Sequence, residues 1–426
     1  MNETIAAVAT AHGVGSISII RLSGSDALGL ALKLTKITSL VPRYATLTKI
    51  YAEGELIDEA LLIYFKAPHS FTGEDVVEFQ LHGGLVVANL ILGELIKNGA
   101  RLARAGEFSK RALINGKMDF SKIEAINSLI NAKSEDSVKI IARTMRGDLA
   151  KFADEIRSEL VKTLAFVETS IDYADDDLPA DLLESISQML QQNSAKLGRI
   201  VAISQSRKGL LEGFKIAIVG KPNVGKSSIL NSLLSYERAI ISDEAGTTRD
   251  SIEEALKIGT HLVRIIDTAG IRKNAGKIEQ IGISYSLRAI EEADVILAVF
   301  DASQEADEQD SEILELLKKS QKKIFYVLNK CDLGVKFTNL ENPIKICAKQ
   351  GTDEIISNLK TYLDAQETSE ILLNSTRQIS SCEAASEAIK RALNLLAESE
   401  LELFAYELNA AIEQISSITK PFERSE

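Results

Sequence analysis

The sequence predicts a multidomain protein with a small α+β domain, followed by an all-α helical domain that carries an inserted α/β domain. The chain has 426 residues, too many for one compact core. Apolar strands alternate with helices in its central third, whereas helical periodicity dominates on both sides of that stretch. We therefore expect an α+β domain at 1–115, the two parts of the helical domain at 116–211 and 369–426, and the inserted domain at 212–368.

The first domain mixes short strands with one apolar helix. Apolar or alternating runs predict strands at Ser16–Leu22, Ala60–Phe65 and Val76–Leu81. A longer apolar run predicts a helix at Leu85–Ile96. This mixture is typical of a small α+β domain.

The helical domain is indicated by apolar residues that recur every three or four positions from Ser121 to about Leu211. The pattern breaks at residues 172–181, where Asp172, Asp175, Asp176 and Asp177 form an acidic cluster. We interpret that cluster as a solvated loop that caps the next helix, the alternative being a metal site. A second helical stretch follows Ser375 and completes the domain.

The inserted domain is predicted to hold a mostly parallel sheet with helices on both faces. Its expected strands are Ile216–Val219, Leu262–Ile266, Val295–Phe300, Ile324–Leu328 and Ile344–Cys347.

A phosphate-binding loop follows the first of these strands. Residues 220–227 read G-x-x-x-x-G-K-S, between a strand and a helix. In such a loop the backbone N–H groups and the helix N-terminus surround an anion. Lys226 is predicted to reach the β- and γ-phosphates, and the Ser227 hydroxyl to bind Mg²⁺. A simple glycine turn is the alternative, but the full pattern in its strand–helix context favours a nucleoside triphosphate.

Two further segments suit the phosphate end of such a site. In Gly246–Asp250 (GTTRD), Thr248 is predicted to cover the γ-phosphate and give Mg²⁺ a second protein ligand. In Asp267–Gly270 (DTAG), the aspartate is expected to hold Mg²⁺ through water, and the Gly270 N–H to contact the γ-phosphate.

Two other segments indicate that the base is guanine. In Asn329–Asp332 (NKCD), Asp332 can accept from both N1–H and N2–H₂ of guanine, a donor pair that adenine lacks. In Cys347–Lys349 (CAK), the Ala348 N–H can meet guanine O6. The residues predicted to contact GTP are Asn223, Val224, Gly225, Lys226, Ser227, Ser228, Ser242, Asp243, Glu244, Ala245, Gly246, Thr247, Thr248, Asp267, Thr268, Ala269, Gly270, Asn329, Lys330, Asp332, Cys347, Ala348 and Lys349.

Bulk properties limit the setting. The net charge of −12 argues against a general electrostatic grip on nucleic acid. Three cysteines without metal or disulfide spacing fit a reducing cytoplasm. We see neither a signal peptide nor an apolar run long enough to cross a bilayer, and expect a cytoplasmic protein without membrane contact.

The motifs outside the inserted domain make the resemblance specific. Residues 70–84 (SFTGEDVVEFQLHGG) and 103–126 (ARAGEFSKRALINGKMDFSKIEAI), together with the GTP motifs, resemble the MnmE (TrmE) family of tRNA-modifying GTPases. The match runs from about Thr4 to about Leu408. It implies that the inserted domain is a Ras-like α/β P-loop GTPase domain. It also implies a homodimer that acts on tRNA with an FAD-dependent partner of the MnmG (GidA) type. The implied reaction adds an aminomethyl or carboxymethylaminomethyl group at C5 of the wobble uridine.

The resemblance also implies further site residues. Arg21, Glu78 and Lys117 match positions that contact a formyl-tetrahydrofolate-type one-carbon donor. Glu279 matches a catalytic glutamate, which is needed because Ile271 occupies the position where many GTPases have a water-orienting glutamine. A K⁺ ion is implied beside the phosphates, with ligands from the Asn223 side chain and the carbonyls of Ser242, Glu244 and Thr247. Arg249 and Arg272 are alternative sources of positive charge.

Other interpretations remain open from the sequence alone. The basic residues between Arg101 and Lys117 suit either tRNA phosphates or a solvated basic face. The family ends in a C-x-G-K tetrapeptide, whereas this chain ends at PFERSE, so the chain as written is expected to hydrolyse GTP without completing tRNA modification. The rival functions are a ribosome-assembly-type GTPase switch and a P-loop kinase or ATPase.

Overall fold

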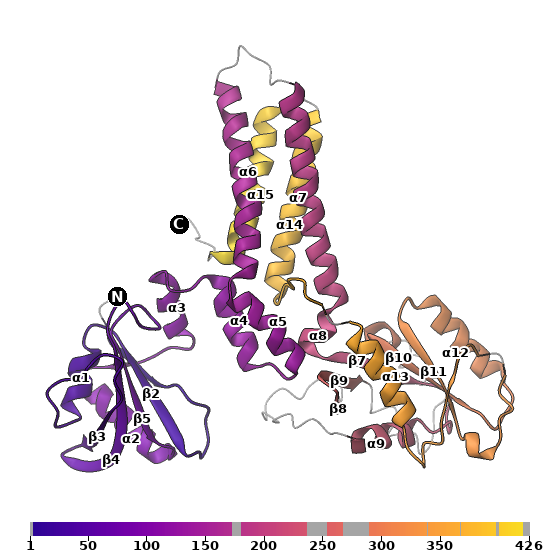
Figure 1. Cartoon of the computed structure of the whole chain (residues 1–426), viewed down its shortest axis with the longest axis horizontal. Helices are drawn as coiled ribbons and strands as arrows, with labels where there is room; N and C mark the ends of the chain where they lie inside the picture. Colours follow the sequence, from indigo (N-terminus) through magenta and orange to yellow (C-terminus); the bar gives the residue numbers. More distant parts are fainter. Residues whose placement is uncertain are drawn as a thin grey trace. The chain divides into compact units, whose positions relative to one another are not determined.

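A computed structural model describes residues 3–172, 180–236, 254–266, 289–338, 340–366, 368–397 and 400–420. The chain divides into two compact units, Met1–Ile123 and Glu124–Glu426, and each is described by itself (Figure 1).

The first unit is built on a six-stranded sheet in the order β3-β4-β5-β2-β1-β6. All its pairings are antiparallel except β1 with β6. The predicted strands are present, but β1, β3 and β6 escaped prediction because they are short or carry polar residues on an exposed face. The strands are β1 (Ile5–Val8), β2 (Ile17–Ser23), β3 (Thr46–Ala52), β4 (Glu55–Phe65), β5 (Val76–His82) and β6 (Arg101–Leu102).

Three helices accompany this sheet among the described residues, where the sequence predicted one. They are α1 (Ala27–Lys33), α2 (Leu85–Lys97) and α3 (Glu107–Ile114). Helix α2, the predicted one, buries Ala88, Ile91 and Leu95 in the same apolar cluster as the strands. Burial of a side chain such as Ile91 or Leu95 contributes roughly 1.5–3 kcal/mol through the hydrophobic effect.

The second unit contains a helical bundle whose helices come from both sides of the insertion. Helices α6, α7, α14 and α15 run side by side in Figure 1 and share one apolar core, which includes Leu160, Leu190, Ile389 and Leu408. The predicted insertion is thereby confirmed. The helices of this part are α4 (Phe120–Ile130), α5 (Glu135–Met145), α6 (Asp148–Asp172), α7 (Ala180–Ser206), α8 (Lys208–Glu212), α14 (Thr376–Ala397) and α15 (Leu401–Thr419).

The inserted α/β part holds a six-stranded sheet in the order β12-β11-β10-β7-β9-β8. All pairings are parallel except that of β8 with β9. The strands are β7 (Phe214–Val219), β8 (Glu254–Ile258), β9 (His261–Ile266), β10 (Val295–Asp301), β11 (Lys323–Asn329) and β12 (Ile344–Lys345). Strand β12 is shorter than the predicted Ile344–Cys347, and β8 was not predicted.

Helices cover both faces of this sheet, as expected. Helices α9 (Lys226–Tyr236) and α13 (Asp353–Asp364) contribute to the apolar cluster on one face, and α12 (Glu308–Lys319) to the cluster on the other. The carboxyl ends of parallel strands meet at one edge of a sheet, so the loops after β7, β10 and β11 are neighbours.

Candidate functional site

The loop between β7 and α9 is packed too tightly for side chains at its two glycines. A Cβ on Gly220 would lie 2.3 Å from the Val299 carbonyl oxygen, and one on Gly225 would lie 2.1 Å from Asn329 Nδ2. Between them, Asn223 takes a left-handed conformation with φ of 65°. The glycines therefore serve close backbone approach, and the loop is held against β10 and the end of β11.

The Lys226 ammonium sits inside this loop. It donates to the carbonyl oxygens of Gly220 at 2.7 Å and Lys221 at 2.8 Å. Burial lowers the pKa of Lys226 to about 8. Within the described ranges no carboxylate forms an ion pair with this ammonium. Among the described residues this partly buried cation is balanced only by backbone dipoles, so the loop fits an anionic ligand such as a phosphate group.

Asn329 joins the phosphate loop to the two segments predicted to bind the base. Asn329 is only 3% exposed. The amide Nδ2 donates to the Val224 carbonyl at 2.8 Å, and Oδ1 accepts from the Ala348 N–H at 2.9 Å. The three predicted segments therefore meet at one edge of the sheet.

Lys330 makes a second connection at the same edge. Its ammonium donates to the Asn223 carbonyl at 2.8 Å and to Asp301 Oδ2 at 2.6 Å. Asp332 follows in the short 3₁₀ helix Cys331–Leu333 and is exposed. Directly after the phosphate loop, Ser227 and Ser228 are exposed in the first turn of α9.

Several predicted residues lie outside the described ranges. They are Ser242, Asp243, Glu244, Ala245, Gly246, Thr247, Thr248, Asp267, Thr268, Ala269, Gly270 and the predicted catalytic residue Glu279. Of the predicted metal ligands, Ser227 for Mg²⁺ and Asn223 for K⁺ are described. Both occupy the phosphate loop or the helix turn that follows it, and both carry side-chain oxygens, which these hard cations prefer.

Arg21 and Glu78, two residues predicted to contact a folate, are paired in the first unit. They lie opposite each other on β2 and β5. Arg21 Nε and Nη2 both contact Glu78 Oε1, at 2.8 and 2.7 Å. The guanidinium also stacks 4.8 Å from the ring centre of Phe71 and 5.7 Å from that of Phe108. The ion pair is therefore flanked by aromatic rings and is partly open to solvent, with side chains 24% and 14% exposed.

Lys117, the third predicted folate residue, approaches the loop that carries Phe71. A Cβ on Gly73 would lie 3.1 Å from Lys117 Cε. The Asn115 amide also donates to the Thr72 carbonyl at 2.7 Å. The turn after α3 and the loop 70–75 are thus held together, next to Arg21.

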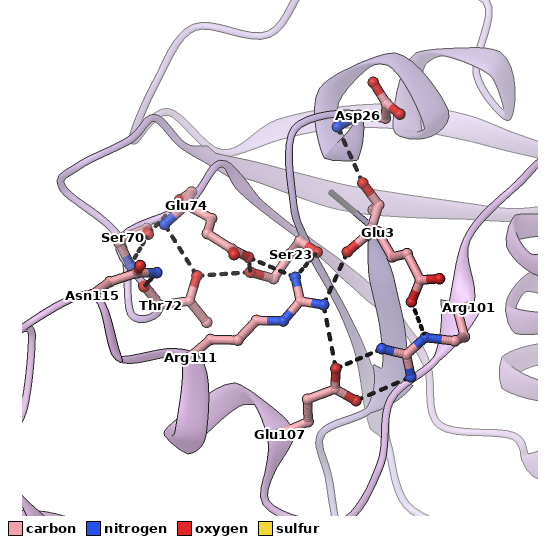
Figure 2. A network of polar contacts seen from close by, with 12 residues as sticks. Glu3, Ser23, Asp26, Ser70, Thr72, Glu74, Arg101, Glu107, Arg111 and Asn115 are labelled. Carbon is pink, nitrogen blue, oxygen red and sulfur yellow. Dashed lines mark hydrogen bonds and ion pairs between the residues drawn. The ribbon is translucent and has the colours of Figure 1, made fainter. Parts of the chain in front are cut away.

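A buried polar network supports this arrangement (Figure 2). Arg111, only 2% exposed, donates to Glu74 Oε2 at 2.8 Å and to the Glu3 carbonyl at 2.9 Å. Ser23 contacts both Thr72, at 2.7 Å, and Glu74, at 2.8 Å. Residues 70–75 are therefore fixed to α3 and to β2.

The network corrects one interpretation of the basic segment Arg101–Lys117. Arg111 is buried, and Arg101 is paired with Glu107 and Glu3. The hydrogen bonds from Arg101 contribute most to lowering the pKa of Glu107 to about 2. These two arginines are therefore structural rather than part of a solvated basic face, whereas Arg104, Lys110 and Lys117 are exposed.

Sequence reasoning missed the acids around the nucleotide site. Asp301 pairs with Lys330, and Asp307 and Asp310 pair with Lys221 of the phosphate loop. The only available signal was the position of Asp301 at the end of a fully buried strand. The partners are separated by up to 89 positions, so spacing did not reveal them.

Comparisons with known families cover nearly the whole chain. A family model described as "GTP-binding protein TrmE N-terminus" matches residues 4–117, and one described as "MnmE helical domain" matches residues 120–426.

Similar proteins extend over the full length. A protein of Campylobacter curvus (strain 525.92) named "tRNA modification GTPase MnmE" is 69% identical over all of this chain and 96% of its own length. Proteins of the same name from Campylobacter concisus (strain 13826) and Sulfurimonas denitrificans (strain ATCC 33889 / DSM 1251) are 65% and 53% identical, again over all of this chain.

Among solved structures, Era in complex with MgGDPNP and part of 16S ribosomal RNA aligns with 41% of this chain and 66% of its own, at 27% identity and a TM-score of 0.28. Across the described parts of the chain, every helix is too short or too polar to span a membrane.

Proposed function

Because the chain belongs to the MnmE family of tRNA modification GTPases, we propose that it hydrolyses GTP to drive addition of an aminomethyl or carboxymethylaminomethyl group at C5 of the wobble uridine. GTP hydrolysis provides conformational work and no atom of the added group.

The nucleotide is assigned to the edge of the sheet where Asn329 joins three loops. Asp332 accepts from guanine N1–H and N2–H₂, and the Ala348 N–H donates to O6. Lys226 donates to the β- and γ-phosphates, and because its ammonium has three donors it keeps the bond to the Lys221 carbonyl. Ser227 and Thr248 hold Mg²⁺, with Asp267 contacting it through water and Gly270 sensing the γ-phosphate. The meeting of the loops supports this assignment.

For hydrolysis we assign Glu279 to orient the attacking water. K⁺, held by the Asn223 side chain and by carbonyls of Ser242, Glu244 and Thr247, offsets charge that develops between the β- and γ-phosphates. The left-handed backbone of Asn223 within the phosphate loop is consistent with a role beside the phosphates.

The first unit is assigned to a formyl-tetrahydrofolate-type donor. The Arg21–Glu78 ion pair carries this proposal. Among the described residues both contacts of the pair use Glu78 Oε1, which leaves Oε2 to accept from the amino and ring N–H groups of a pterin. Phe71 offers an aromatic face, and the exposed Lys117 suits the glutamate tail of a folate.

The partners follow from the family. We propose a homodimer formed through the first unit, which acts on tRNA in the cytoplasm with an FAD-dependent protein of the MnmG type. The net charge of −12 makes local exposed cations such as Arg104 and Lys110 better candidates for tRNA contact than the surface as a whole.

Titration of the full chain with 5-formyl-tetrahydrofolate tests the site that carries this function. Glu78→Gln keeps the shape of the side chain but turns half of the carboxylate into a donor, so we expect binding to weaken about tenfold or more. Glu59→Gln, an exposed change on β4, is the matched control and should bind like the wild type. Equal affinity of the Glu78 variant and the wild type would refute the folate assignment.

A further inference from the structure

The phosphate loop contains a second lysine, Lys221, that is held by a different element. Its ammonium contacts Asp307 Oδ2 at 2.7 Å and Asp310 Oδ2 at 2.8 Å, at the N-terminus of α12. The Lys221 side chain is 11% exposed and that of Asp310 only 1%, whereas that of Asp307 is 52% exposed. The inner ion pair is therefore largely shielded from water.

Both carboxylates are fixed by the backbone of α12 before they meet the lysine. Asp307 Oδ1 accepts from the Asp310 N–H at 3.0 Å, and Asp310 Oδ2 accepts from the Asp307 N–H at 3.2 Å. This reciprocal capping box holds both side chains in place. Within the described residues, Asp310 Oδ1 has no hydrogen-bond partner and Lys221 is the only cation paired with this carboxylate. A buried carboxylate depends strongly on its single cation.

The backbone of Lys221 connects this ion pair to the phosphate-binding lysine. The Lys221 carbonyl accepts from the Lys226 ammonium at 2.8 Å. Thus the side chain of Lys221 is tied to α12, while its carbonyl holds the group assigned to the phosphates. Any shift of Lys221 away from α12 moves one of the two carbonyls that accept from Lys226.

The geometry points to Lys221 as a positioning residue for the nucleotide, which acts through the phosphate loop and makes the N-terminus of α12 part of the binding machinery. This inference rests on the proposed nucleotide site. The competing possibility is that Lys221 leaves the two aspartates and contacts a phosphate directly.

The two possibilities predict opposite effects of Asp310→Asn. If Lys221 positions the loop, the weakened ion pair loosens it, and affinity for both GDP and GTP falls. If Lys221 contacts phosphate directly, the same change frees the lysine and tightens binding. Direct contact with the γ-phosphate would also make Lys221→Met weaken GTP more than GDP.

The test is nucleotide dissociation and affinity in the full chain, measured with N-methylanthraniloyl-GDP and a non-hydrolysable GTP analogue. For Lys221→Met we expect about tenfold weaker binding of both nucleotides, mainly from faster dissociation. Asp310→Asn should weaken both about threefold or more, and Lys221→Arg should restore most of the affinity because a guanidinium keeps the charge. The combined Lys221→Met and Asp310→Asn variant should bind both nucleotides as tightly as Lys221→Met alone, because the two substitutions remove the same ion pair.

Three controls separate the outcomes. Lys318→Met removes an exposed lysine from the same helix and should leave affinity unchanged. Asp307→Asn, which removes only the half-exposed partner, gives a smaller loss and keeps the test available if Lys221→Met does not fold. Asp332→Asn should exchange guanine for xanthine nucleotides; if it binds GDP like the wild type, the nucleotide site itself is misassigned. Tighter binding by Asp310→Asn, or wild-type affinity of Lys221→Met, would overturn the positioning role.

Discussion

Asn329 shows how much of the nucleotide site depends on one side chain. Its Nδ2 donates to the phosphate loop, and its Oδ1 accepts from Ala348 in the segment assigned to the base. Each bond contributes about 0.5–1.5 kcal/mol net, but a lost partner in this buried position costs about 1–3 kcal/mol. The residue therefore fixes the spacing between the groups assigned to the phosphates and to the base.

The cysteines give a residue-level prediction about the same site. Burial raises the pKa of Cys382 to about 12, and burial is also the largest cause of the raised pKa of Cys331. Thiolates react and thiols do not, so at about pH 8 we expect iodoacetamide to modify partly exposed Cys347 while Cys382 stays unmodified until the protein unfolds. GDP should slow the modification of Cys347 about tenfold, because Cys347 precedes Ala348.

Mass spectrometry of the modified peptides measures both effects. Denatured protein, in which all three cysteines react, is the control. Modification of Cys347 at the same rate with and without GDP would place the base elsewhere, and early modification of Cys382 would contradict its burial in the helical bundle.

Among the elements, the β8–β9 hairpin lies between the two segments predicted to contact the γ-phosphate. Strand β8 begins directly after residues 237–253, and β9 ends directly before Asp267, so the hairpin connects the two segments predicted to contact the γ-phosphate. At its turn, fully buried His261 contacts Asp364 Oδ1 through Nε2 at 2.9 Å. Asp136 Oδ2 of helix α5 lies 2.6 Å from His261 Nδ1, although off the direction needed for a hydrogen bond. The hairpin thus links the GTPase part to the helical part.

We predict that His261→Ala destabilises this junction and weakens the coupling between GTP hydrolysis and tRNA modification. The change leaves buried Asp136 without the imidazole beside it, and unfolding free energy should fall by about 2 kcal/mol, as measured by urea denaturation. GTP hydrolysis should persist, while tRNA modification per GTP hydrolysed decreases. His12→Ala, an exposed change, is the control. If the unfolding free energy and the tRNA modification per GTP hydrolysed are both unchanged, the junction does not couple the GTPase part to the helical part.

At the scale of the whole molecule, hydrolysis is expected to depend on K⁺. We predict at least about tenfold faster hydrolysis in KCl than in NaCl at equal ionic strength, measured by phosphate release. A K⁺ ion compensates transition-state charge, and Asn223→Ala should remove most of the difference because it deletes a proposed ligand. Equal rates of the wild type in both salts would argue for a charge supplied by the protein, such as Arg249 or Arg272.

The sequence alone was sufficient for features with local signatures. The phosphate loop, the NKCD segment, half of the strands of the first sheet and all strands of the second except β8 were predicted, because their signals are written in adjacent residues. The insertion was visible because helical periodicity stops before residue 214 and resumes after Ser375. Short or half-exposed strands such as β3 and β8 were missed, since their apolar residues are too few to set a period.

Only the tertiary structure decided which ionisable residues are partners. Lys221 and Asp310, Arg111 and Glu74, and His261 and Asp136 are brought together by folding over separations of 37 to 125 positions. The reason is physical: an exposed cation and a buried, paired one have the same letter in the sequence, and burial and pairing depend on what the fold places beside them. The residues of the site could therefore be identified from short stretches of sequence, whereas the ion pairs that support them could not.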